Sequence, residues 1–223
     1  MKEFLFGNAK CFEFEAPENL IDDILNNIDN EEVVYKSISP NQSNVPIMGY
    51  TKSGDGYTSF YHKELYDFIN ICLQQVSEKT FNNFSLKIID LWSIKTKFGQ
   101  SSQVHNHKMS MFSGLLYLTD CDRSETEFIM NSRLYDNWSF FMHDNYIKDM
   151  QLSLKVKPKK GKLIIWPSDI DHKITPHSNK SDRYTIAFNT FIEGKSFKAS
   201  ARINLSTTNG CGTDDAIPFR KTY

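Results

Sequence analysis

The sequence predicts an α+β fold: a double-stranded β-helix, or jelly roll, with N-terminal helices packed on one of its sheets. Two observations predict it. In the N-terminal part of the chain, apolar residues recur at helical spacing. From residue 84 onward the period changes to two, and turn-forming residues separate about eight short segments. Helices followed by many short strands favour a helical layer on a two-sheet β core.

The helical part begins after a short strand at residues 11–15. The first helix is expected over residues 16–28, where Pro17 fits the first turn because that position needs no amide hydrogen. The second is expected from Ser59, a residue type that caps helices, to about residue 79. Each helix has an apolar stripe that should face a core. The stripe of the first helix is Leu20, Ile21, Ile24, Leu25 and Ile28, and that of the second is Tyr61, Leu65, Phe68, Ile69, Cys72 and Val76.

The β part alternates apolar and polar residues, and in residues 152–157 the alternation is typical of a strand with one wet face. The lysine-rich segment KPKKGK, residues 157–162, is read as a solvated hairpin turn. The expected strands are 84–95, 112–118, 126–130, 138–143, 152–157, 162–166, 183–193 and 198–205.

The length of 223 residues fits one domain, residues 1–223, because a single hydrophobic core grows to roughly 250 residues before chains divide. Within it we expect a helical support region (1–83), a jelly-roll core (84–205) and a C-terminal tail (206–223). The tail is a candidate for contacts between two copies of the chain in a homodimer.

Charge and cysteine content exclude several classes of function. The net charge of -1 lacks the basic excess that nucleic acids or anionic membranes require of a partner. The sequence shows neither a signal peptide nor an apolar run that could span a membrane, so a soluble, cytoplasmic protein is expected. The four cysteines form no C-x-x-C pair and are interpreted as reduced structural thiols.

His105 and His107 are two of only six histidines, and they precede an apolar strand. If this segment is extended, both imidazoles point to the same side, because residues i and i+2 of a strand share a face. Converging neutral imidazoles suit a divalent transition metal such as iron or zinc. The candidate for a third ligand is His172, which opens a later strand.

The strand that begins at Arg183 has one unusual face. Tyr184, Ile186 and Phe188 form a core face, whereas Arg183 and Thr185 share the other side. A buried arginine needs an anionic partner, and a guanidinium binds a carboxylate through two parallel hydrogen bonds. A ligand that carries a carboxylate would supply that partner.

These residues, in the segments 105–120, 125–128 and 161–189, resemble the 2-oxoglutarate/Fe(II)-dependent oxygenases, in particular the prolyl 4-hydroxylase-like group and related bacterial and phage proteins. The resemblance implies that His105 and His172 bind Fe(II) and that Arg183 and Thr185 bind the far carboxylate of 2-oxoglutarate. It further implies that the hydroxyl of Tyr117 lies near this cosubstrate. The implied activity is hydroxylation of a substrate with release of succinate and CO2.

The chain departs from the family pattern at His107, where Asp or Glu is usual. Either three imidazoles, those of His105, His107 and His172, bind the iron, or His107 is turned aside and another group completes the site. We favour the first. Asp120 and Asp122 are alternative carboxylates, but their place in a turn favours solvation.

A non-catalytic jelly-roll module that binds a metal or ligand is the competing hypothesis, and it has no need of Arg183 and Thr185 in the pocket. A small molecule or a peptide is the expected substrate. The other histidines, His62, His143 and His177, are interpreted as surface, structural or loop residues, and the tryptophans Trp92, Trp138 and Trp166 as core or pocket wall.

Overall fold

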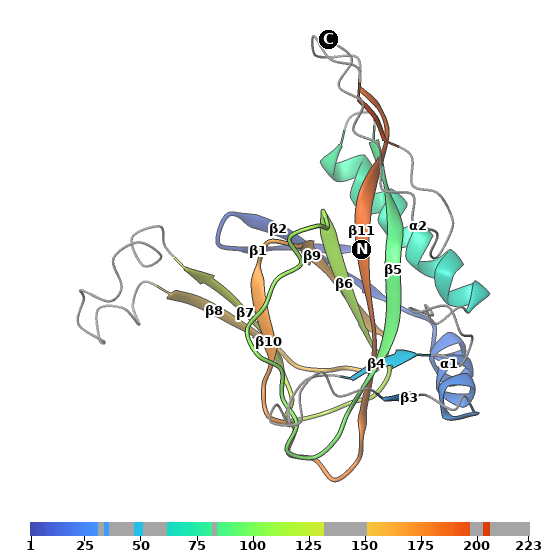
Figure 1. Ribbon diagram of the computed structural model, residues 1–223, viewed down its shortest axis with the longest axis vertical. Helices are drawn as coiled ribbons and strands as arrows, with labels where there is room; N and C mark the ends of the chain where they lie inside the picture. Colours follow the sequence, from blue (N-terminus) through green and yellow to red (C-terminus); the bar gives the residue numbers. More distant parts are fainter. Residues whose placement is uncertain are drawn as a thin grey trace.

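The computed structural model describes residues 1–30, 34–35, 47–50, 62–81, 84–131, 151–196 and 203–205. They form two helices and two antiparallel sheets, and the helices lie on the side of the larger sheet that faces away from the smaller one (Figure 1). The predicted α+β class is therefore confirmed. The expected strand 138–143, most of the segment 198–205 and the tail 206–223 lie outside the described residues.

Helix α1 (Glu18–Asn30) and helix α2 (Lys63–Thr80) cover the larger sheet with their apolar stripes. The predicted start of α2 at Ser59 is wrong, because the helix begins at Lys63 and His62 is its N-cap. The His62 Nδ1 accepts a hydrogen bond of 3.3 Å from the Leu65 amide, and its Nε2 lies 2.8 Å from the Asp23 carboxylate. His62 therefore ties α2 to α1, a role that its residue type does not suggest.

The larger sheet has the order β1-β2-β9-β6-β11-β5-β4-β3, with β12 also paired to β11, and the smaller sheet has the order β10-β7-β8. The N-terminal hairpin of β1 and β2 extends the larger sheet, and β1 was not anticipated from the sequence. The described strands are β1 (Lys2–Phe6), β2 (Ala9–Glu15), β3 (Val34–Tyr35), β4 (Ile47–Tyr50), β5 (Phe84–Thr96), β6 (Phe112–Tyr117), β7 (Thr126–Asn131), β8 (Gln151–Val156), β9 (Lys162–Pro167), β10 (Asp171–Ile174), β11 (Arg183–Ser196) and β12 (Ile203–Leu205).

The larger sheet separates two apolar layers, because successive side chains of a strand point to opposite faces. The layer between this sheet and the helices buries Phe12, Leu116, Leu163, Ile165, Ile186 and Phe188 against the stripes of α1 and α2. The layer between the two sheets buries Ile94, Leu115, Tyr117, Phe128, Ile164 and Trp166. The candidate site residues of β11 lie on the inner face, toward the smaller sheet.

The segment KPKKGK does not form the predicted hairpin turn. Strand β8 pairs with β7 in the smaller sheet, whereas β9 pairs with β2 and β6 in the larger one, so the segment crosses between sheets. Lys159 and Lys160 form ion pairs with Glu15 and Asp22, at 2.6 and 2.7 Å. These ion pairs attach the crossing to the end of β2 and to α1, although an exposed ion pair contributes little energy.

The described cysteines Cys11, Cys72 and Cys121 are free and buried, in agreement with reduced structural thiols. Burial raises the pKa of Cys11 and of Cys72 to about 12. Among the described residues, neither helix is long and apolar enough to cross a membrane.

Candidate metal centre

His105, His107 and His172 converge, as the sequence predicted. One ring nitrogen from each lies within 4.8 Å of those of the other two. The ring centroids are 5.3 Å apart for His105 and His107, 4.4 Å for His105 and His172, and 5.2 Å for His107 and His172. Three imidazoles at this spacing form a donor set that suits a divalent transition metal.

Main-chain hydrogen bonds hold the three histidines together. The amide of His105 donates to the His172 carbonyl at 3.0 Å and the amide of His172 donates back at 2.9 Å. Two residues further on, the His107 amide donates to the Ser168 carbonyl at 2.9 Å. The segment is an isolated bridge and not a regular strand, so the prediction of one strand face is correct only locally.

The contacts of Nδ1 leave Nε2 of two rings available as a ligand. Nδ1 of His105 lies 2.9 Å from the Gln103 carbonyl, and Nδ1 of His172 lies 3.1 Å from the Ile170 carbonyl. A carbonyl only accepts, so each Nδ1 carries the hydrogen and each Nε2 keeps a lone pair. The same arrangement orients metal-binding histidines in general.

Burial keeps the imidazoles of His107 and His172 neutral, as metal binding requires. Desolvation, together with the neighbouring His105, lowers the pKa of His107 to about 4. The same causes, desolvation first, lower the pKa of His172 to about 3. At pH 7 both rings are therefore uncharged and can donate a lone pair.

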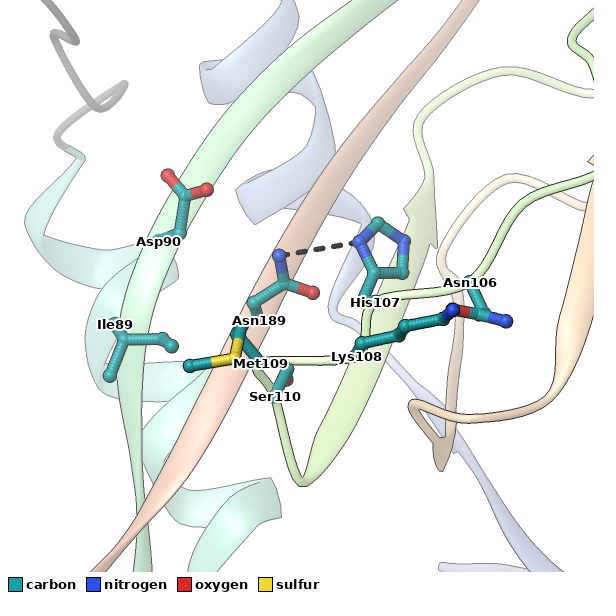
Figure 2. Close-up of a pocket in the computed structure, with 8 residues that line it drawn as sticks. All are labelled: Ile89, Asp90, Asn106, His107, Lys108, Met109, Ser110 and Asn189. Atoms are coloured by element: carbon teal, nitrogen blue, oxygen red, sulfur yellow. Dashed lines mark hydrogen bonds between the residues drawn. The ribbon is translucent and has the colours of Figure 1, made fainter.

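Asn189 contacts His107 (Figure 2) and connects this ring to a chain of buried hydroxyl groups. Its Nδ2 lies 3.5 Å from His107 Nδ1, and its Oδ1 lies 2.8 Å from the hydroxyl of Ser113. Ser113 in turn contacts Ser168 at 2.8 Å. If the amide is rotated by 180°, Oδ1 accepts from His107 Nδ1 and frees Nε2 of that ring as well, and the hydroxyl of Ser113 can then donate to Ser168.

The group of potential ligands around the three histidines contains no carboxylate from the described residues. Asp120 instead accepts a hydrogen bond of 2.8 Å from the Lys160 amide in the crossing segment. Asp120 and Asp122 therefore do not take the position of the usual Asp or Glu. The donor set of three imidazoles therefore contains no anionic group.

Arg183 is fully buried on the inner face of β11. Its guanidinium lies over the Tyr117 ring, 5.3 Å from the centroid, and Nη2 lies 3.4 Å from the Thr126 hydroxyl. Nε and Nη1 have no hydrogen-bond partner, and no carboxylate of the described residues forms an ion pair with this side chain. Because an unpaired buried charge is costly, desolvation lowers the pKa of Arg183, and the guanidinium requires an anion.

Further polar groups without partners surround Arg183. The hydroxyls of Thr185 and Thr96 are buried and form no hydrogen bond within the described part of the chain. Thr96 is the direct partner of Arg183 in the pairing of β5 with β11, and Thr185 is paired with Tyr117 of β6. The Tyr117 hydroxyl donates to Thr126 at 2.7 Å. The sequence predicted this pocket from Arg183, Thr185 and Tyr117, but it did not indicate Thr96.

Aromatic side chains form the wall next to the histidines. The Trp166 ring lies 5.1 Å from that of His172, and the Trp92 ring lies 6.1 Å from that of His107. Both positions agree with the predicted core or pocket wall, whereas Trp138 is outside the described residues. The indole Nε1 of Trp166 is another buried donor without a partner among the described residues.

The other histidines lie apart from the donor set. His177 is a loop residue, as predicted, but it is buried, with Nε2 2.7 Å from the Ser181 carbonyl and Nδ1 3.6 Å from the Cys121 sulfur. His62, the N-cap of α2, does have a partner, Asp23, which the sequence did not indicate. His143 is outside the described residues.

Comparisons with known proteins agree with this geometry. Residues 90–189 match the model of a family described as putative 2OG-Fe(II) oxygenase. This segment contains all the candidate residues named above. No curated protein matches the chain.

Several solved structures share the fold at low sequence identity. A viral collagen prolyl hydroxylase from Paramecium bursaria Chlorella virus-1, in complex with 2OG, is 13% identical with a TM-score of 0.51, covering 81% of this chain and 94% of that one. HygX from Streptomyces hygroscopicus, with nickel and 2-oxoglutarate bound, is 10% identical with a TM-score of 0.55, covering 84% and 83%. The epimerase SnoN from nogalamycin biosynthesis is 10% identical with a TM-score of 0.55, covering 92% and 91%.

Proposed function

We propose that this chain is a 2-oxoglutarate/Fe(II)-dependent oxygenase, whose family model matches residues 90–189, and that it holds its iron through three histidines, His105, His107 and His172. The support is their convergence, the neutral state of His107 and His172, and the orientation of at least two rings with Nε2 free. A donor set without a carboxylate leaves the full charge of Fe(II) to be balanced by other ligands. The anionic cosubstrate is therefore more important for this centre than for one that contains a carboxylate.

We further propose that Arg183 and Thr185 bind the far carboxylate of 2-oxoglutarate. The observation that carries this proposal is the fully buried guanidinium, whose Nε and Nη1 have no partner in the described part of the chain. A carboxylate satisfies two such donors at once and neutralises the charge. A module that bound only a metal would leave this buried charge unexplained.

Tyr117 has a positioning role in the proposed cosubstrate pocket. Its ring supports the guanidinium from one side, and its hydroxyl is held by Thr126. Because burial raises the pKa of the Tyr117 hydroxyl, this group remains a neutral donor at neutral pH. The pocket is thus preorganised for one dianion.

Bound iron and 2-oxoglutarate would supply an O2-dependent oxidation in which a substrate C–H becomes C–OH while the cosubstrate leaves as succinate and CO2. The chain supplies the surroundings for that reaction. The histidines fix the metal, Arg183 and Thr185 hold the cosubstrate, and the apolar layer around Phe128 and Trp166 excludes water. We propose a small molecule or a peptide as the substrate, and a jelly roll as the arrangement of the two sheets.

The test is aerobic incubation with Fe(II), 2-oxoglutarate and pooled candidate substrates, with succinate as the measured product. We expect succinate to form only when Fe(II) is added, and a chelator to abolish its formation. Formation that continues at the same rate in the presence of the chelator would contradict the proposal. A matched incubation without 2-oxoglutarate gives the background.

A further inference from the structure

A cavity of about 540 Å³ opens directly beside His107 (Figure 2). His107 and Asn189 form its inner side. Ile89, Asp90 and Met109 line one side of the opening, and Lys108 lines the other. Its volume is within the range of pockets that bind small molecules.

Asp90 faces this cavity because of the pairing of the strands. It is the direct partner of Asn189 in the register of β5 with β11, so its side chain shares the inner face of the sheet with the amide that contacts His107. The register shifts immediately afterwards, where Thr190 pairs with Ile88 and leaves Ile89 as the extra residue of a β-bulge. Bulges commonly redirect side chains beside active sites.

Within the described part of the chain, the carboxylate of Asp90 forms no ion pair with a basic side chain. The Asp90 side chain is exposed, so the carboxylate is accessible to a ligand in the cavity. The surrounding groups raise its pKa by desolvation, and the hydrogen bond from the Leu91 amide opposes this shift.

Lys108 does not neutralise Asp90. In Figure 2 its side chain runs toward Asn106 and away from the carboxylate, on the other side of His107. Asp90 and Lys108 are the charged residues of the lining, since His107 is neutral. In the same lining, the side chains of Ile89 and Met109 offer an exposed apolar surface, with 46% and 85% of their areas accessible.

We propose that the substrate of this enzyme carries a protonated amino group that Asp90 binds, with a carbon chain that lies on Ile89 and Met109 and leads toward His107. The inference rests on the proposed function, because it assigns the reacting C–H bond to the part of the substrate nearest His107. Neighbouring strands are roughly 5 Å apart, so an ammonium group at Asp90 lies about one strand spacing from Asn189. Asp90 is therefore a residue that determines substrate specificity.

The experiment compares three probes of one chain length: n-hexylamine, hexan-1-ol and hexanoate. Their dissociation constants are measured by titration calorimetry without oxygen, on the full chain loaded with Fe(II) and 2-oxoglutarate. Alkylamines are protonated at neutral pH, as the lysine side chain is. We expect the amine to bind the parent chain about fivefold more tightly than the alcohol, the gain typical of a partly exposed ion pair.

Asp90→Asn should remove this preference for the amine without changing the affinity for 2-oxoglutarate. Lys108→Gln is the matched control, since it removes the other charge of the cavity and should leave the preference intact. Provided that 2-oxoglutarate still binds, any of three results would overturn the inference. The parent could bind the amine and the alcohol equally, it could bind hexanoate most tightly, or Asp90→Asn could keep the full preference for the amine. Failure of the parent chain to bind 2-oxoglutarate with Fe(II) would instead overturn the proposed function, and this inference with it.

Discussion

His105 and His172 exchange two main-chain hydrogen bonds, at 3.0 and 2.9 Å, so that two candidate ligands from distant parts of the sequence are fixed opposite each other. Main-chain bonds do not depend on side-chain identity, and replacing either imidazole should leave this bridge in place. The metal-binding role of each ring can therefore be tested by substitution without loss of the surrounding fold.

The first prediction concerns the third histidine. His107→Ala should lower the affinity for Fe(II) by more than about 100-fold, as His105→Ala and His172→Ala should, because loss of a ligand costs more than loss of an outer contact. His107→Asp restores a carboxylate and should retain the metal. Anaerobic metal titration measures all four variants.

Asn106→Ala is the control for that series, since this side chain lies between the two histidines but donates to Asp171 at 2.7 Å. It should bind Fe(II) as the parent does. If His107→Ala also binds Fe(II) as well as the parent, the site with three histidines is wrong, and His107 contacts the substrate instead.

The second prediction uses the buried charge of Arg183. Arg183→Met should lower the affinity for 2-oxoglutarate about 30-fold or more, because one partner of a buried charge pair is lost. The stability of the chain without cosubstrate should not fall, since an unpaired buried charge is removed. Thermal unfolding with and without 2-oxoglutarate measures both the stability of the variant and its affinity for the cosubstrate. If 2-oxoglutarate stabilises the Arg183→Met variant as much as it stabilises the parent, the assignment of Arg183 is wrong.

The third prediction compares two buried threonines of β11. The Thr185 hydroxyl has no partner in the described part of the chain, whereas that of Thr190 accepts from the Phe112 amide and donates to its carbonyl. Thr185→Val should weaken 2-oxoglutarate binding about tenfold and leave the free energy of unfolding nearly unchanged. Thr190→Val should instead leave 2-oxoglutarate binding unchanged and lower the free energy of unfolding, measured in urea, by about 1–3 kcal/mol. The same response from both variants would remove Thr185 from the cosubstrate pocket.

The fourth prediction follows from the raised pKa of the thiols. With a pKa of about 12 for Cys11 and Cys72, the thiolate fraction at pH 8 is on the order of 10⁻⁴, and the thiolate is the reactive form. Iodoacetamide at pH 8 should therefore leave both cysteines unlabelled in the folded chain and label them after unfolding in urea. Peptide mass spectrometry distinguishes the sites, and rapid labelling of either in the folded chain would refute the prediction.

The fifth prediction concerns Gly114 in the centre of β6. A Cβ atom at this position would overlap the ring of Phe188, which is fully buried and cannot move aside. Gly114→Ala should destabilise the chain by about 1–3 kcal/mol in urea unfolding. Gly99→Asn is the control, because nothing lies near its Cβ position and asparagine tolerates its φ of +79°. A fully stable Gly114→Ala variant would show that the core repacks at little cost.

The elements that the sequence predicted best are those in which the periodicity of one segment is sufficient evidence. The stripe of α1 and the alternation of β11 each depend on local spacing, and both are present as expected. The start of α2, with His62 as its N-cap, depends instead on a contact with Asp23. The path of the KPKKGK segment depends on the strands with which β8 and β9 pair. Neither could be read from local spacing, because partners distant in sequence determine both.

The sequence by itself determined which side chains are candidates for the chemistry, since the types and spacing of His105, His107, His172, Arg183 and Thr185 already indicate a metal and a carboxylate ligand. The tertiary structure decided which groups remain without partners. Pairing of β5 with β11 places Thr96 beside Arg183 at one end of the two strands, and Asp90 beside Asn189 further along the same face of the sheet. Register and burial are properties of several strands together, and they decide where an unsatisfied donor or carboxylate is left for a ligand.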